Sequence, residues 1–294
     1  MKYFKLTIKS IKSFCNLNLL ETAASIAYYA LFSLPAVLFI LIRISDVVID
    51  PQKARQYIFN EIGQMIGPKT TNSLEMAVTQ IEFSEEETWK VVLSIVILIF
   101  TASTIFSTLQ NSFNRIFNIH TEAEGWKSVF QFLLKRLLSI GLLLGFALIL
   151  LFSLVLDMIL SALSSQIVEF ISGTEWIVVI TGSIIAPIIV MTVLFILIFK
   201  VLPDAHLSTR EVLSTSLLIS FLFLIGKFAI GYYVGNTRMQ NIYSSAAAVV
   251  ALLLWSYYSS AIVLFGCTFL KEKLAMEGKD ISLRTIYQDR EPEE

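Results

Sequence analysis

The chain has 294 residues, of which 56% are hydrophobic and only 15% charged, and its mean hydropathy is +0.74. Soluble globular domains carry about 25% charged residues, so this composition excludes an ordinary soluble domain and favours a membrane protein. The net charge of −1 comes from 22 basic and 23 acidic residues. Nucleic-acid binding proteins usually have a basic surplus, so we do not expect a nucleic acid as partner.

Residues 1–22 predict a basic amphipathic segment. One helical stripe holds its apolar positions and the lysines lie beside that stripe: Phe4, Ile8, Ile11 and Cys15, then Lys5, Lys9 and Lys12. This pattern is typical of a helix that lies on an anionic leaflet. A solvated basic tail stays open as the alternative, because Asn16 and Asn18 interrupt the pattern.

Six apolar stretches follow, and each is long enough to cross a bilayer as a helix. They lie at about 23–49, 88–109, 137–163, 176–201, 212–234 and 243–270. We therefore predict an all-α polytopic membrane protein with a six-helix transmembrane domain over 23–270. Pro35 and Pro187 fall inside two spans, where neighbouring helices must satisfy the freed carbonyls.

The distribution of lysine and arginine predicts the orientation of these spans. Fifteen of the 22 basic residues lie on the side that contains both termini, and four lie on the other side. By the positive-inside rule both termini are cytoplasmic. The segment 50–87 is then an extracytoplasmic loop, and 271–294 is a charged cytoplasmic tail.

The sixth span is the one we expect at the centre of the bundle. Between Asn241 and Leu270 it holds no charge, and a patch of small residues lies beside an arc of serines. Small residues let another helix approach closely, and hydroxyl groups in hydrocarbon seek partners on neighbouring helices. Its candidate pathway residues are Ser256, Tyr257, Ser259 and Ser260.

Four ionisable residues fall at membrane depth, and such residues often mark a pathway. They are Arg43, Asp46, Asp157 and Lys227. For Asp46 and Asp157 we favour snorkelling to the outer interface, since each lies within a turn or two of its span's end. For Arg43 and Lys227 two interpretations remain: the side chain lines a pathway, or it snorkels to the outer interface.

Tyr28 and Tyr29 lie in the cytoplasmic half of the first predicted span, with threonines in the same half of the second. They could line an inner vestibule. An interfacial aromatic belt with hydrogen bonds between helices is the alternative, and it is slightly favoured.

The motifs of common enzymes are missing from the sequence. It has two histidines, His120 and His206, on separate loops without metal-ligand spacing, and it has neither a P-loop nor a GxSxG elbow. Hydrolysis of phosphodiesters with metals needs clustered carboxylates or histidines. We therefore expect no enzyme activity, no catalytic residues, no metal and no cofactor.

Four stretches together resemble the YihY/BrkB family of bacterial inner-membrane proteins. They are AASIAYYALFSLPAVLFI at 23–40, NSFNRIFNI at 111–119, FKVLPDAHLS at 199–208 and IYSSAAAVVALLLWSYYSSAIVLFG at 242–266. The resemblance implies a six-helix protein of the inner membrane, from a family that has carried the label ribonuclease BN. The chain departs from the family pattern at Cys267-Thr268, where members usually read alanine and glutamate.

Two functions from different classes fit these observations. The first is a transporter or flippase-like conduit for an amphiphilic or anionic lipid or an envelope precursor, with membrane lipids as its partners. The second is a scaffold without transport, which supports the cell envelope through proteins bound at the 50–87 loop or the cytoplasmic tails. The sequence indicates neither the substrate nor the oligomeric state.

Overall fold

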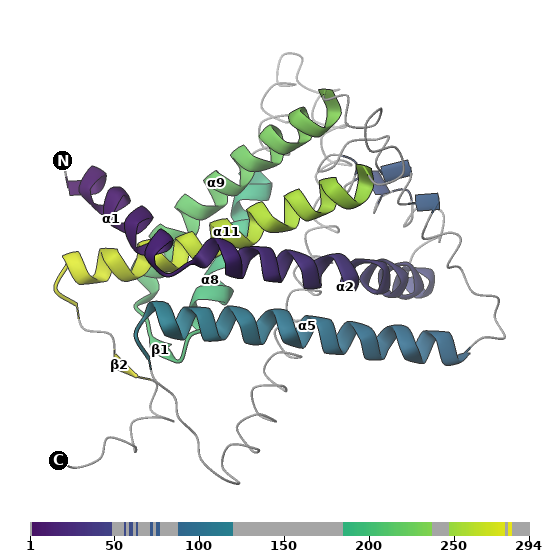
Figure 1. Ribbon diagram of the computed structural model, residues 1–294, viewed down its shortest axis with the longest axis horizontal. Helices are drawn as coiled ribbons and strands as arrows, with labels where there is room; N and C mark the ends of the chain where they lie inside the picture. Colours follow the sequence, from purple (N-terminus) through teal and green to yellow (C-terminus); the bar gives the residue numbers. More distant parts are fainter. Residues whose placement is uncertain are drawn as a thin grey trace, which may run out of the picture. The chain divides into compact units, whose positions relative to one another are not determined.

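The computed structural model of the protein describes residues 2–48, 88–119, 185–236, 247–279 and 282–283, with a few single positions between 50 and 87. The described residues are helical almost throughout, as the sequence predicts (Figure 1). The helices are α1 (Lys2–Asn16), α2 (Leu19–Val48), α5 (Thr88–Ile116), α8 (Ala186–Val201), α9 (Thr209–Asn236) and α11 (Ala247–Met276). Two short strands, β1 (Ala205–His206) and β2 (Ser282–Leu283), pair in antiparallel fashion.

Helices α2, α5 and α11 extend farthest beyond the apolar stretches that predict them. Helix α2 begins four residues before position 23, α5 continues seven residues beyond 109, and α11 continues six residues beyond 270. The predicted tail therefore begins inside a helix. Hydropathy marks the length that a bilayer can cover, whereas a helix continues until a cap ends it. The predicted span 137–163 and residues 176–184 of the next one lie outside the described residues.

Residues in the left-handed conformation end three of the helices. Asn18 follows α1 with φ 50°, Asn118 follows α5 with φ 57°, and Gly278 follows α11 with φ 66°. Asparagine and glycine are the residues that most readily adopt this conformation. Beyond α11 the N–H of Lys279 donates to the carbonyl of Leu274 at 3.1 Å, which is the long hydrogen bond of a Schellman motif. The chain therefore reverses sharply at Lys279.

The chain divides into two compact units, which we describe separately. Unit 1 contains Met1–Ile11, Phe113–Phe221 and Gly266–Glu294, and unit 2 contains Lys12–Ser112 and Leu222–Phe265. Helices α1, α5, α9 and α11 contribute residues to both units.

The core of unit 1 surrounds Phe199 of α8. Its ring stacks on Phe113 of α5, with ring centroids 5.9 Å apart. A Cβ atom added at Gly266 of α11 would lie 2.8 Å from Phe199 Cζ and 2.6 Å from Cγ1 of Ile219. Such contacts are too short for carbon atoms, so a residue without a side chain lets α11 pack directly on α8 and α9.

Unit 2 contains a second close contact between α9 and α11. A Cβ atom added at Gly226 would lie 1.7 Å from Cε1 of Tyr258. The Tyr258 hydroxyl donates a hydrogen bond of 2.8 Å to the carbonyl of Leu222. The ring therefore occupies the space that Gly226 leaves open, and its polar end finds a partner on the same helix, as buried tyrosines usually do.

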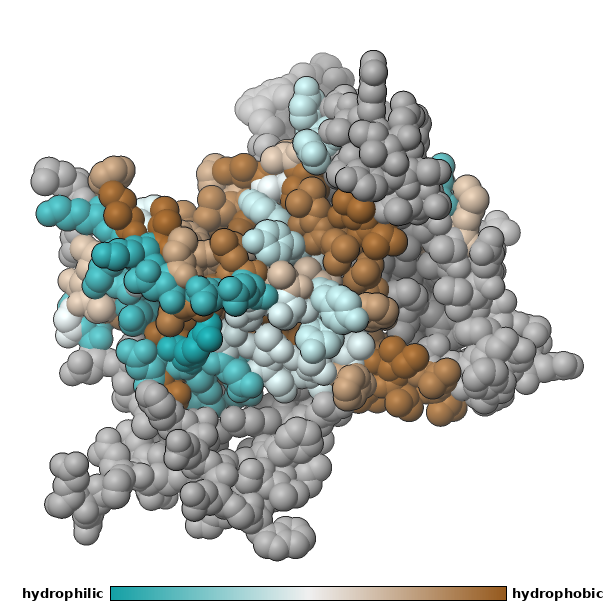
Figure 2. Space-filling view, in the orientation of Figure 1, coloured by the Kyte–Doolittle hydropathy of each residue, from teal (hydrophilic) through white to brown (hydrophobic). Residues whose placement is uncertain are grey.

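Large apolar side chains lie exposed along one stripe of α9. They recur every three or four residues and are Leu213, Leu217, Phe221, Ile225, Phe228 and Tyr232. Soluble proteins rarely expose an apolar surface of this length, and such surfaces mark membrane or protein contacts. In Figure 2 hydrophobic residues cover much of the helical surface, and hydrophilic residues gather near α1 and the C-terminal part of α11.

Candidate functional site

The predicted pathway residues of α11 lie in its middle, in unit 2. Ser256, Tyr257 and Ser259 are half-buried and Ser260 is buried. The hydroxyl of Ser259 donates to the carbonyl of Trp255, and that of Ser260 donates to the carbonyl of Ser256, each at 2.8 Å. Ser259 and Ser260 thus donate within their own helix and not to a neighbouring one. A serine hydroxyl can donate a hydrogen bond to the backbone carbonyl one turn earlier in its own helix, and these two serines do so.

Tyr28 and Tyr29 lie together on α2. Their ring centroids are 5.8 Å apart, and the Tyr28 ring also lies 4.8 Å from that of Phe32. Tyr28 is exposed and Tyr29 half-buried. On α5 the hydroxyl of Thr104 donates to Phe100, within its own helix. No hydrogen bond or ring contact among the described residues joins the tyrosine pair to the serines of α11.

The ionisable candidates are described unequally. Lys227 lies on α9 with a half-buried side chain, directly after Gly226. Arg43 and Asp46 lie on α2, but their side chains fall outside the described residues, and so does Asp157. The structure thus places Lys227 next to the close contact between α9 and α11 and leaves the other three untested.

Unit 1 holds a set of buried polar side chains that the sequence reasoning missed. Asn114, in the last turn of α5, and Asp204, directly after α8, are both buried. The Asn114 amide donates to Asp204 Oδ2 at 2.8 Å, and the Asp204 backbone N–H donates to Asn114 Oδ1 at 3.1 Å. The two bonds satisfy both ends of the amide and join the end of α5 to the segment after α8.

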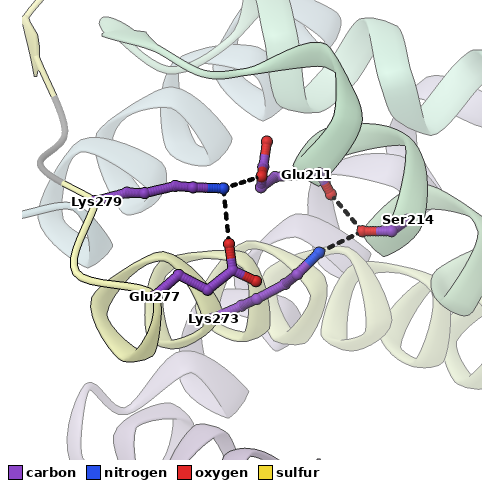
Figure 3. Close-up of polar contacts among 5 residues, drawn as sticks. All are labelled: Glu211, Ser214, Lys273, Glu277 and Lys279. Atoms are coloured by element: carbon purple, nitrogen blue, oxygen red, sulfur yellow. Dashed lines mark hydrogen bonds and ion pairs between the residues drawn. The ribbon is translucent and has the colours of Figure 1, made fainter.

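A second group joins the start of α9 to the end of α11 (Figure 3). Glu211 is buried, and one of its carboxylate oxygens pairs with Lys279, which also pairs with Glu277 at 2.8 Å. Lys273 of α11 donates to the hydroxyl of Ser214. Glu211 lies in the first turn of α9, where a negative charge also interacts favourably with the helix dipole. The Schellman turn at Gly278 brings Lys279 back toward this carboxylate.

A third group centres on Glu272 of α11, which is buried. Lys9 of α1 lies 2.8 Å from its Oε2 atom, at ion-pair distance though without hydrogen-bond alignment. Lys271 lies 3.4 Å from Oε1. Thr268, at the position where the sequence departs from the family pattern, is fully buried one turn before Glu272. We refer to the three groups together as the unit 1 polar cluster.

Not every polar atom near this cluster is satisfied. On α9 the hydroxyls of Thr215 and Ser216 are fully buried and have no hydrogen-bond partner among the described residues. One turn later Thr192 of α8 donates to Ser220 of α9 at 3.0 Å. Hydroxyls of this kind contribute modestly to helix association in membranes. The described part of α9 therefore carries buried hydroxyl groups in two successive turns, and Ser220 bonds to a neighbouring helix.

The pairing at the end of α11 alters the ionisation of two exposed groups. The hydrogen bonds that Lys279 donates to Glu211 and Glu277 raise the pKa of Lys279 above its ordinary value. The hydrogen bond from Lys279 in turn lowers the pKa of the Glu277 carboxyl. Both shifts favour the charged forms, so this ion pair persists across the neutral pH range.

The described residues contain no group of three or more His, Cys, Asp or Glu side chains that could hold a metal ion. His206 lies in β1, opposite Ser282 of β2, and His120 falls outside the described residues. The unit 1 polar cluster thus consists of carboxylates that are paired with lysines or an amide. Its arrangement ties helix ends together.

Two sequence signals could have pointed to this cluster. Asn114 and Asp204 lie inside the stretches NSFNRIFNI and FKVLPDAHLS, at the ends of apolar helices. Ser208 and Glu211 have the S-x-x-E spacing of a capping box. Glu272 and Lys279 carry no such signal, because the sequence assigns them to a tail.

The apolar helices identify the class of protein. Within the described residues, Val96–Ile116, Thr209–Tyr233 and Val249–Met276 are long and apolar enough to cross a membrane. With the exposed apolar stripe of α9, they define an integral membrane protein. Residues 10–276 match the family described as virulence factor BrkB, and the chain belongs to that family.

Curated relatives carry the name UPF0761 membrane protein. The chain is 30% identical over 255 residues to one from Azotobacter vinelandii, 26% over 258 residues to one from Alcanivorax borkumensis, and 27% over 261 residues to one from Pseudomonas aeruginosa. These matches cover 84–85% of this chain and 56–58% of the relatives. The chain therefore spans a little over half the length of the relatives. No solved structure matches it.

Proposed function

We propose that this protein is a conduit that moves an amphiphile, such as an anionic lipid or an envelope precursor, across the bacterial inner membrane. The observation that supports this function is the position of Lys227 in the segment Thr209–Tyr233, which can cross a membrane. Lys227 lies about 9 Å from the end of that segment at 1.5 Å per residue. A cation at such depth is costly, and where it is retained it usually faces a bundle interior or a water-filled path.

The neighbours of Lys227 are consistent with this role. The residue before Lys227, Gly226, packs against the ring of Tyr258, and the residue after it, Phe228, is exposed. Lys227 is half-buried between them. A half-buried ammonium beside a helix contact can meet an anionic headgroup without leaving its helix. In this proposal the protein catalyses no covalent reaction and needs no cofactor, six helices cross the membrane, and both termini are cytoplasmic.

Reconstitution into vesicles tests the proposal. The full chain should move a fluorescent phosphatidylglycerol between leaflets faster than protein-free vesicles do. Lys227→Met keeps the apolar stem and removes the charge, so this variant should fold and lose most of the movement. Lys200→Met makes the same change at the end of α8 and is the matched control, with movement near that of the unaltered chain. If the unaltered protein moves lipids with several different headgroups no faster than protein-free vesicles do, the conduit hypothesis is wrong.

The scaffold hypothesis predicts the opposite pattern in cells. Neutralising Arg43 and Lys227 would leave envelope integrity intact, while replacing residues 50–87 would abolish it. Met76 in that segment is a large apolar residue that is exposed, as a surface for a partner protein would require. A complementation assay with both variants separates the two functions.

A further inference from the structure

Helix α1 has two different faces. Leu6, Ser10 and Phe14 are buried at a spacing of four residues, and the Ser10 hydroxyl donates to the carbonyl of Leu6 at 2.8 Å. This face packs against the rest of the protein with its polar group satisfied. Lys9 adds the ion pair with Glu272 of α11. The orientation of α1 about its own axis is therefore set by packing and by one charge pair.

The second face is apolar and uncovered. Phe4 is 72% exposed, Ile8 52% and Ile11 50%, and Cys15 continues the same stripe. These residues recur every three or four positions, so they lie on one side of the helix. Leaving them in water is unfavourable by a hydrophobic transfer energy that scales with the exposed apolar area of each side chain.

Positive charge borders this stripe. Lys5 and Lys12 are exposed, and neither has an ion-pair partner within the described residues. Helix α1 contains no acidic residue. An apolar stripe edged by lysines without carboxylates complements a surface whose interior is hydrocarbon and whose headgroups are anionic.

The connection to α2 keeps α1 at the edge of the bilayer. Only Leu17 and Asn18 separate the two helices, and Asn18 has the left-handed conformation that turns the chain. A two-residue link cannot carry α1 away from the end of α2, which forms the first predicted span. A helix tied there lies at the depth of the lipid headgroups.

We propose that α1 is an interfacial anchor whose Phe4, Ile8, Ile11 and Cys15 stripe enters an anionic phospholipid leaflet, with Lys5 and Lys12 at its phosphates. The positive-inside count predicts that this leaflet is cytoplasmic. The anchor is independent of any conduit activity. The docking of α1 then depends on the lipid composition of that leaflet.

Cys15 supplies the first test, because it is exposed whereas Cys267 is buried. A nitroxide label on Cys15 of the full chain, in vesicles of phosphatidylcholine and phosphatidylglycerol, should be shielded from a water-soluble nickel chelate and accessible to oxygen. The matched control is a label at the adjacent exposed position, Asn16→Cys in a Cys15→Ser background, which should be open to the chelate. Equal chelate access at both positions would overturn the anchor and leave the stripe as a face for a protein partner.

The second test concerns charge. The variant Lys5→Gln, Lys12→Gln leaves the buried face and Lys9 unaltered, so the protein should fold. Its preference for phosphatidylglycerol over phosphatidylcholine, measured by native mass spectrometry, should fall about fivefold for each lysine removed. The chelate shielding at Cys15 should then no longer differ between anionic and zwitterionic vesicles. An unchanged preference for phosphatidylglycerol would overturn the anionic specificity.

Discussion

Asn114 and Asp204 lie 90 residues apart in the sequence, and their side chains hold each other through two hydrogen bonds in the buried part of unit 1. One bond runs from the amide to the carboxylate and the other from the backbone to the amide. The end of α5 is thereby fixed to the turn after α8. The partners come from two of the four stretches that resemble the YihY/BrkB family, Asn114 from 111–119 and Asp204 from 199–208.

Replacing Asn114 by alanine should destabilise the protein by about 1–3 kcal/mol, because the buried Asp204 carboxylate loses the hydrogen bond that the Asn114 amide donates. The loss can be measured as a lower midpoint of thermal unfolding in detergent. Asn16→Ala, at an exposed asparagine, is the control and should change stability little. In an Asp204→Ala background the Asn114→Ala change should cost much less, and equal costs in both backgrounds would contradict the pairing.

Gly226→Ala should be destabilising by about 1–3 kcal/mol, the range for overpacked cores, because the added Cβ collides with the Tyr258 ring. The shift of the ring also breaks its hydrogen bond to Leu222. Gly63→Ala is the matched control, since a Cβ there would lie 3.5 Å from the Thr71 hydroxyl, an ordinary contact. Thermal unfolding compares the two variants, and equal midpoints would argue against the close approach of α9 and α11.

Lys9→Met should cost about 1 kcal/mol, since the lysine is half exposed and the solvent screens its pair with Glu272. The double variant Lys9→Met, Glu272→Gln should recover part of that loss, because the buried charge left behind is removed with its partner. Lys12→Met is the control on the same helix. A double variant less stable than Lys9→Met alone would show that Glu272 is held by other groups.

The pairing of Lys279 with Glu211 and Glu277 predicts a plateau of stability with pH. The pKa of Lys279 is raised, so its contribution is complete below the ordinary lysine pKa and disappears as pH rises through the raised value. The pKa of Glu277 is lowered, so its contribution is present above the ordinary carboxylate pKa and disappears as pH falls through the lowered value.

In a series of Tm measurements against pH, Lys279→Met should flatten both edges of this plateau. Lys5→Met, on the exposed side of α1, should leave the profile unchanged. If the Lys279→Met profile matches that of the unaltered chain, the pair contributes nothing to stability.

The two cysteines should react very differently. Cys15 is exposed and Cys267 fully buried, and an alkylating reagent needs access to the thiol. A maleimide should therefore add one label to the folded protein and a second only after unfolding, as intact mass will show. Labelling of the Cys15→Ser variant in the folded state would mean that α11 is open around Cys267.

The sequence alone was sufficient for the class of protein and for most helices. Long, predominantly apolar stretches have one physical solution in a bilayer, a helix whose backbone groups bond to one another, so α5, α9 and α11 could be predicted from hydropathy. Helix α1 and its apolar stripe could also be predicted from the sequence, because the stripe depends only on the helical repeat. Helix ends were less accurate, since caps such as Asn118 and Gly278 decide them.

Only the tertiary structure decided which polar residues meet. Lys9 and Glu272, or Glu211 and Lys279, are far apart in the chain, and no local pattern links them. The serines of α11 show the converse: their composition suggested partners on other helices, yet Ser259 and Ser260 bond within their own helix. Backbone carbonyls one turn away are always within reach of a hydroxyl, whereas contacts between helices depend on packing. In this protein the packing depends on two single positions, Gly226 and Gly266, where the absence of a side chain lets two helices touch.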